Sequence, residues 1–95
     1  MSSLEASEVD QFQRLFATAV ERYEAGDVIA AESTLEDLLA KVPDHPQILN
    51  YLAVTKHIRG GHIEAQALLA RAVEIDPDFV DAWNNLGLLS LEQDK

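Results

Sequence analysis

The chain has 95 residues, enough for one small domain with its own hydrophobic core but not for two. Hydrophobic residues make up 47% of the sequence, as in folded globular proteins, and the absence of cysteine excludes disulfides and thiolate metal sites. The formal net charge is −10, so the chain should repel phosphate backbones, and we expect no nucleic-acid partner. A neutral or basic protein or peptide is favoured instead.

Residues 1–7 contain no apolar segment like that of a signal peptide. No later stretch approaches the roughly 20 apolar residues that span a membrane. We therefore expect no membrane association and a cytoplasmic location. If the chain is a fragment, a signal upstream of it would change this location.

Apolar residues recur at helical spacing in five segments, and no segment shows sustained alternation with a period of two. The sequence therefore predicts an all-α fold of five helices and no sheet. The first helix is expected to follow a flexible lead-in over residues 1–7, with Ser7 as its N-cap. It should end near Ala25, because Gly26 is a typical helix terminator.

Polar caps and prolines set the limits expected for the second and third helices. Asp27 caps the second helix, which ends at Val42 because the proline that follows disfavours helical backbone there. Asp44 caps the third helix, and Gln47 three residues later allows a capping box. The third helix is expected to run to Arg59.

The fourth and fifth helices follow the same plan. Gly60 and Gly61 form a tight turn before the fourth helix, which ends at about Ile75, two residues before a proline. Asp78 is the expected N-cap of the fifth helix, and Asp81 lies in its first turn, where a negative charge is favourable.

The sequence repeats itself with a period of 34 residues, which aligns Gly26 with Gly60 and Pro43 with Pro77. Small residues form one column of this alignment and should allow close approach of paired helices: Ala19, Ala53 and Gly87. Large apolar residues form another: Leu15, Leu49 and Trp83. We place the domain at residues 8–95, with repeats over 12–45, 46–79 and 80–95, the last of which holds only a first helix.

The segment from Trp83 to Gly87 (WNNLG) resembles the opening of tetratricopeptide (TPR) repeats. Ala65, Leu69 and Pro77 resemble the rest of the signature at its proper spacing, and the resemblance covers about residues 12–95. The sequence departs from the pattern at Thr18, where leucine is usual. It also departs at three positions where tyrosine is customary, and we expect these changes to soften the packing of paired helices: Arg22, Lys56 and Ser90.

The resemblance implies antiparallel helix pairs stacked as a right-handed superhelix, with a concave groove lined by the first helix of each pair. Such domains bind a peptide segment or a partner helix and act as scaffolds rather than enzymes. The matching groove positions are Phe16, Val20, Tyr23, Asn50, Val54, His57, Asn84, Leu88 and Leu91. They are largely apolar, and Asn50 and Asn84 offer amide groups to a peptide backbone. The alternative is that part of this set only fills the inner surface, above all Tyr23.

Co-chaperone TPR domains hold the carboxylate of a chaperone tail with lysine, asparagine and arginine side chains. The matching positions in this sequence all differ: Phe16, Val20, Tyr51, Asp81 and Asn85. Asp81 also has the wrong charge for an anion. We therefore expect no function of this carboxylate-clamp type.

Metal, cofactor and catalytic sites are not expected. His57 and His62 lie on either side of a turn, at a spacing unlike the i, i+4 pair of a helical zinc site. Asp76 and Asp78 lack the glycine and distal glutamate of a calcium loop. The sequence contains no nucleophile elbow and no glycine-rich phosphate loop, so we expect no enzyme activity.

The third repeat carries Trp83 and Leu86 in the columns that would pack on the second helix of its own pair. A terminal repeat should instead present a polar outer face. A tryptophan buries on the order of 200 Å², and at about 25 cal/mol per Å² the two exposed side chains together forgo several kcal/mol. Three explanations remain open: a longer repeat array, docking of residues 79–91 on a second copy, or folding of Trp83 back onto the second pair.

The sequence therefore predicts a protein–protein interaction and scaffold module that binds a peptide or partner helix in its groove. Two alternatives remain. The chain is the non-catalytic N-terminal TPR part of a larger enzyme, or it is a self-assembly module that dimerises through its fifth helix.

Overall fold

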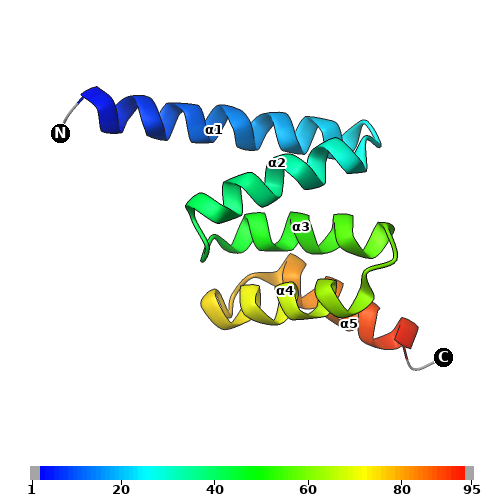
Figure 1. Ribbon diagram of the computed structural model, residues 1–95. Helices are drawn as coiled ribbons and strands as arrows, with labels where there is room; N and C mark the ends of the chain where they lie inside the picture. The colour runs from blue at the N-terminus through cyan, green and yellow to red at the C-terminus, as the bar shows by residue number, and fades with distance from the viewer. Residues whose placement is uncertain (1–2, 94–95) are drawn as a thin grey trace.

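The computed structural model describes residues 3–93, which form five helices stacked one beside the next (Figure 1). They are α1 (Ser3–Glu24), α2 (Val28–Lys41), α3 (Pro46–Ile58), α4 (His62–Ile75) and α5 (Val80–Gln93). Residues 3–93 contain no strand, so the predicted all-α fold is confirmed. None of the helices described is long and apolar enough to cross a membrane.

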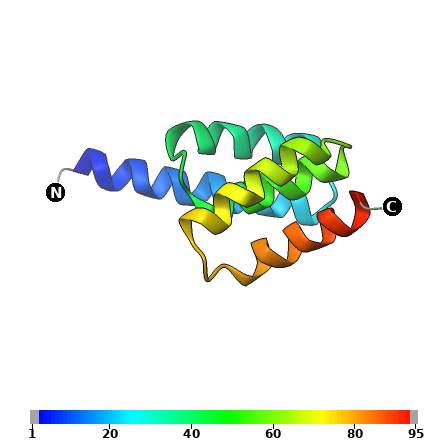
Figure 2. The same cartoon turned by 90° about the horizontal axis from the view of Figure 1, so that it is seen from below.

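Each helix packs mainly against the next one along the chain, and narrower contacts join α1 to α3 and α3 to α5. The molecule is elongated, with extents of 52 × 29 × 18 Å. The N-terminal part of α1 projects beyond the other helices in both views (Figures 1 and 2). This order of contacts is that of a helical repeat protein, in which each repeat contacts only the adjacent repeats.

Gly26, Asp27 and Gly60 lie at helix ends where the sequence predicted. Gly26 and Gly60 follow α1 and α3 with φ angles of 86° and 91°, in the left-handed region that glycine adopts without strain. Asp27 caps α2, and its Oδ1 accepts a hydrogen bond from the backbone N–H of Ala30 at 3.3 Å. Both turns therefore follow from local chemistry.

The predicted start of the first helix is wrong. The helix α1 begins at Ser3, so Ser7 lies inside it and is not the N-cap. Residues 3–7 are helical rather than a lead-in, because the Leu-Glu-Ala run after Ser3 consists of good helix formers. Residues 1–2 lie outside the described residues.

The predicted cap of the third helix is also wrong. His45, not Asp44, is the N-cap of α3, and its Nδ1 accepts a hydrogen bond from the N–H of Ile48 at 3.3 Å. Pro46 occupies the first helical position, where its missing N–H costs nothing, so the cap falls on the residue before it. The capping box with Gln47 is therefore not formed, and Asp44 instead binds Arg71 through Oδ1 and Nη2 at 2.6 Å.

The fifth helix starts later than predicted. Val80 is its first residue, which places Phe79 and not Asp78 in the cap position. The backbone N–H of Asp78 donates to Asp76 Oδ1 at 3.2 Å, so these residues form a local turn before the helix. Asp81 lies in the first turn of α5, as predicted.

The core consists of two clusters that meet at α3. One cluster packs α1 and α2 on α3, and its buried members are Ala19, Leu35, Leu38, Ile48 and Leu52. The other packs α4 and α5 on α3, and its buried members are Leu49, Ala53, Ala65, Leu69, Ala72, Val73, Ala82 and Leu89. The small residues Ala19 and Ala53 are fully buried where the helices approach closely, as the repeat predicted.

The third repeat differs from the other two. A Cβ atom built at Gly87 would meet no atom within 4 Å, whereas the equivalent alanines of the first two repeats are fully buried. Trp83 remains 49% exposed, and its Nε1 donates to the carbonyl of Pro77 at 2.8 Å, so complete folding back onto the second pair does not occur. Leu86 packs against the core cluster of α3 and α4, so the expectation that it is left in water is wrong. Val80, Trp83 and Gly87 form what we call the outer face of α5.

A buried carboxylate joins the first repeat to the second. Glu32 on α2 has a side chain only 9% exposed, and its two oxygens lie 2.8 Å from Lys56 Nζ and 2.6 Å from Arg59 Nη1. Lys56 occupies a column where the TPR pattern has tyrosine. It also lies 3.1 Å from Glu36 and 3.5 Å from Glu64, so α2, α3 and α4 meet at one cation. At Lys56 the helices are therefore joined by an ion-pair network between repeats, where the sequence predicted only softer packing.

Hydrogen bonds set the protonation of this network. The bond from Lys56, with a second from Arg59, lowers the pKa of Glu32 from 4.5 to about 2, although burial alone would raise it. The bond to Glu32 likewise raises the pKa of Lys56 above its usual value. Both groups are therefore charged at neutral pH.

We predict that Glu32 makes stability depend on acid pH. Its pKa is lower in the folded than in the unfolded chain, so its contribution is complete above about pH 4.5 and is lost as the pH falls through 4.5 toward 2. Glu32→Gln should lower the free energy of unfolding at pH 7 by on the order of 2 kcal/mol, measured by urea denaturation. Glu36→Gln is the control, because this half-exposed side chain should contribute less than about 1 kcal/mol. Equal losses in the two variants would contradict the prediction.

We also predict a pH dependence at the His45 cap. Burial lowers the pKa of His45 below 6.5, and capping needs the neutral ring, so its stabilisation is present above pH 6.5 and is lost as the pH falls below it. His45→Ala should cost about 1 kcal/mol at pH 7.5. His45→Asn should keep the cap and show a smaller loss of stability than the wild type between pH 7.5 and 5, in urea titrations. Identical pH profiles for wild type and His45→Asn would refute this assignment.

Candidate functional site

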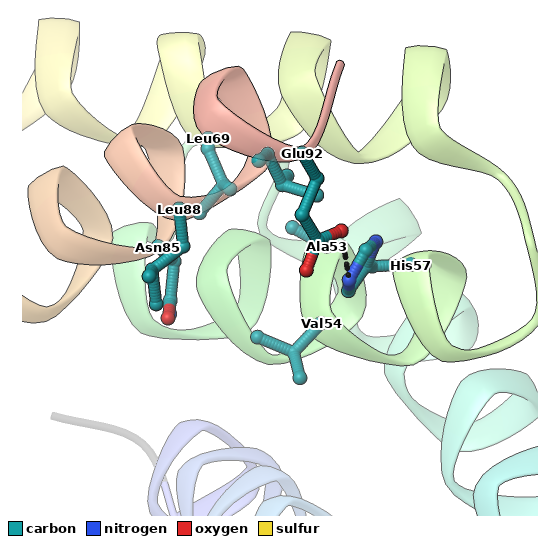
Figure 3. A pocket seen from close by; sticks show the side chains of 8 residues that line it. Ala53, Val54, His57, Leu69, Asn85, Leu88 and Glu92 are labelled. Atoms are coloured by element: carbon teal, nitrogen blue, oxygen red, sulfur yellow. Dashed lines mark ion pairs between the residues drawn. The ribbon is translucent and has the colours of Figure 1, made fainter. Parts of the chain in front are cut away.

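Two neighbouring pockets lie along the first helices of the repeats. The first, of about 130 Å³, lies between α3 and α5 (Figure 3) and is lined by Ala53, Val54, His57, Leu69, Asn85, Leu88, Leu89 and Glu92. The second, of about 330 Å³, lies where α1, α3 and α5 meet and is lined by Tyr23, Asn50, Tyr51, Val54, Asp81, Asn84 and Asn85. Because Val54 and Asn85 belong to both, we treat the two pockets as one groove.

Helical periodicity places the groove residues on one face of α3. Asn50, Val54 and His57 are spaced by four and three residues and lie on one stripe, while the other faces of α3 supply the two core clusters. Figure 3 shows His57 of α3 facing Glu92 of α5, with Val54 on the same helix as His57 and Leu88 on the same helix as Glu92. The groove is therefore bounded by the surface of α3 that the core leaves uncovered.

Six of the nine residues predicted for the groove line these pockets: Tyr23, Asn50, Val54, His57, Asn84 and Leu88. Phe16, Val20 and Leu91 line neither pocket. Phe16 packs against the core, with its ring 5.9 Å from that of Tyr51 in a T-shaped arrangement. Leu91 points from α5 outside the pockets and is exposed. The structure thus narrows the candidate surface to the part around Val54.

Tyr51 and Asn85 are groove residues that the sequence-based assignment missed. Each directly follows an asparagine of the predicted set, one position round the helix. Tyr51 contacts Tyr23 edge to face, with ring centroids 5.5 Å apart, and so extends the groove toward α1. The repeat pattern predicted which face of each helix lines the groove, but not how far the groove extends around the helix.

The two central asparagines are bonded to each other. Asn85 Nδ2 donates to Asn50 Oδ1 at 3.0 Å, which links the second repeat to the third. Two groups of the pair take no part in this bond: the Nδ2 group of Asn50, which is a donor, and the Oδ1 atom of Asn85, which is an acceptor. The pair is thus suited to meet the alternating N–H and C=O groups of a peptide backbone. Asp81 and Glu92 add negative charge to the second and first pocket respectively.

A histidine pair lies beside the first pocket. His57 Nδ1 and His62 Nδ1 are 2.8 Å apart, although the spacing of the two residues is unlike the i, i+4 pair of a helical zinc site. The turn at Gly60 and Gly61 folds the first residue of α4 back onto the last turn of α3. Glu92 Oε2 lies 3.1 Å from His57 Nε2 (Figure 3), and these three residues form the one group of metal-ligating side chains found among the described residues.

Comparisons with known proteins identify the family of this chain. Two sequence models of the tetratricopeptide repeat family match the chain, over residues 16–57 and 68–95. The chain belongs to the TPR family. TPR repeats are protein–protein interaction modules that bind proteins or peptides, and TPR domains are generally not catalytic.

A solved structure shows the same TPR arrangement. The chain superposes on a mutant of the O-GlcNAc transferase from Thermobaculum terrenum with a TM-score of 0.83 and 30% sequence identity. The match covers 94% of this chain but only 16% of the transferase chain. It confirms the helical-repeat fold of the TPR domain. No curated protein matches the chain.

Proposed function

We propose that this TPR domain binds an extended peptide segment or a partner helix in the groove between α1, α3 and α5. The observation that carries the proposal is the combination of exposed apolar side chains with an asparagine pair in one concavity. Leu88 is 59% exposed, and Val54 belongs to both pockets. Asn50 lies one helical turn before Val54 and Asn85 one turn before Leu88, and the pair offers groups of opposite hydrogen-bonding character.

The first pocket suits one apolar side chain of the partner. Ala53 and Leu69 form its inner wall and are fully buried, so a side chain that enters would meet packed apolar atoms. Burying a leucine-sized side chain there stabilises a complex by about 1.5–3 kcal/mol. Backbone hydrogen bonds to the asparagine pair would fix the direction and register of the segment.

The charge of the groove favours a neutral or basic partner. Asp81 and Glu92 lie in its two pockets, and the whole chain carries a formal net charge of −10. These carboxylates would attract lysine or arginine beside the apolar anchor and would repel a C-terminal carboxylate. The groove is therefore unlike a carboxylate clamp, and the proposed role is recognition and scaffolding without catalysis.

We predict that Val54→Glu abolishes binding. Peptides selected from a displayed random library against the wild-type domain should bind it measurably by fluorescence anisotropy. Val54→Glu should weaken them by at least about tenfold, since it puts a charge in the shared wall of both pockets. The control is Ile63→Glu, the same kind of change on α4 at a side chain that is 82% exposed and outside both pockets.

Circular dichroism of both variants separates loss of binding from loss of folding. Equal affinities for wild type and Val54→Glu would show that the groove is not the binding surface. Loss of binding in Ile63→Glu alone would place the surface on α4.

A second candidate function is self-association through residues 79–91. It is favoured by the half-exposed indole of Trp83 on the outer face of α5, beside the open space at Gly87. A copy of the same face would bury both indoles in a two-fold arrangement. This function uses a different face of α5 from the groove, so the two are compatible.

We predict a concentration-dependent dimer that Trp83→Ala weakens. Light scattering over a hundredfold range of concentration should show a rise in mass for the wild type and for the control Ile63→Ala, but a much smaller rise for Trp83→Ala. A strict monomer at the highest concentration in wild type and variant alike would remove the self-association candidate.

The third candidate is a TPR segment of a larger enzyme. It is favoured by the match to the O-GlcNAc transferase, in which the matched part is 16% of the chain. The sequence of the whole gene tests it. A catalytic motif beyond residue 95 would support this candidate, and further 34-residue repeats alone would oppose it.

A further inference from the structure

We propose that His57 and His62 bind a transition-metal ion of the Zn²⁺ class through their Nδ1 atoms, with Glu92 as the positioning residue. The chain contains no cysteine. Apart from the thioether of its single methionine, imidazole is therefore the softest donor that it offers to such a metal. The site lies at the end of the first pocket, where the turn between α3 and α4 meets α5.

The two imidazoles already converge on one point. Their Nδ1 atoms are 2.8 Å apart and the ring planes are inclined by 58°, so one Nδ1 carries a hydrogen and the other accepts it. Two nitrogens bound to a tetrahedral zinc at 2.0–2.1 Å are about 3.3–3.4 Å apart. The rings therefore need to separate by about 0.5 Å for a metal ion to take the place of the shared proton. His62 is exposed, which leaves its ring room to turn.

Glu92 settles which atom of His57 faces the metal. Its Oε2 is 3.1 Å from His57 Nε2, the distance of a hydrogen bond in which Nε2–H donates to the carboxylate. A neutral His57 with its proton on Nε2 has a free lone pair on Nδ1, directed at His62. This is the carboxylate–histidine–metal arrangement, in which the carboxylate fixes the tautomer and raises the basicity of the ligand.

The backbone holds the pair together independently of a metal. Gly60 adopts a φ of 91°, and the N–H of Gly61 donates to the carbonyl of Lys56 at 2.7 Å. This tight turn brings position 62 beside position 57. The nearest cations on α3, Lys56 and Arg59, are both paired with Glu32, so their charges are offset where they adjoin the site. The remaining coordination positions of the metal would be filled by water.

The test is titration of the folded domain with zinc chloride. Isothermal calorimetry should show one zinc per chain for the wild type. His62→Ala should weaken binding by at least tenfold, and Glu92→Ala by 10- to 100-fold. The control is His45→Asn, which removes the third histidine of the chain but keeps a helix cap, and it should bind zinc like the wild type.

NMR spectroscopy of the imidazole nitrogens distinguishes a ligand from a structural role. Zinc should shift the Nδ1 resonances of His57 and His62, leave those of His45 unchanged, and keep the proton of His57 on Nε2. Excess Mg²⁺ should not compete, because a hard cation prefers oxygen ligands. Absence of saturable one-to-one binding, wild-type affinity in His62→Ala, loss of affinity in His45→Asn, or displacement by Mg²⁺ would each overturn the proposal.

Discussion

Burial of α3 from two sides is the interaction on which the rest of this structure depends. Ile48 and Leu52 pack into the cluster shared with α1 and α2, while Leu49 and Ala53 pack into the cluster shared with α4 and α5. A single helix pair has only one apolar face to cover and cannot make a core alone. By taking part in both clusters, α3 sets the spacing of the repeats. The stripe of α3 that carries Asn50, Val54 and His57 stays outside both clusters. That stripe is the wall of the groove.

Ion pairs also join α2 to α3, and the TPR sequence pattern does not predict them. Lys56 stands where tyrosine is customary in TPR repeats, and it binds the nearly buried Glu32 of the preceding repeat. A buried ion pair roughly offsets its own desolvation, but loss of one partner leaves an uncompensated charge. The network therefore contributes more to the fixed position of α2 on α3 than to net stability. None of Glu32, Lys56 and Arg59 lines either pocket of the groove.

The candidate functions use different parts of one helix. The groove side of α5 carries Leu88 and Glu92, while its outer face carries Trp83. Binding of a partner in the groove and docking on the outer face can therefore occur together. The histidine pair at the end of the groove couples the turn before α4 to the last part of α5 through Glu92. A metal there would restrain α4 relative to α3, and the contact of His57 with Glu92 would extend this restraint to α5.

The sequence by itself determined the repeat, the five helices and the turns at Gly26 and Gly60, because these depend on local spacing and local chemistry. It also placed six of its nine predicted groove residues where the pockets lie. It misplaced three caps. The good helix formers after Ser3 start α1 ahead of the expected cap at Ser7, while proline at position 46 and the turn at Asp76 each shift the first helical residue by one place. Only the tertiary structure decided which polar groups meet. Asn85 contacts Asn50, Lys56 contacts Glu32, and His62 contacts His57 because neighbouring helices pack at a particular distance and angle. The spacing of residues along one helix carries no information about that distance and angle.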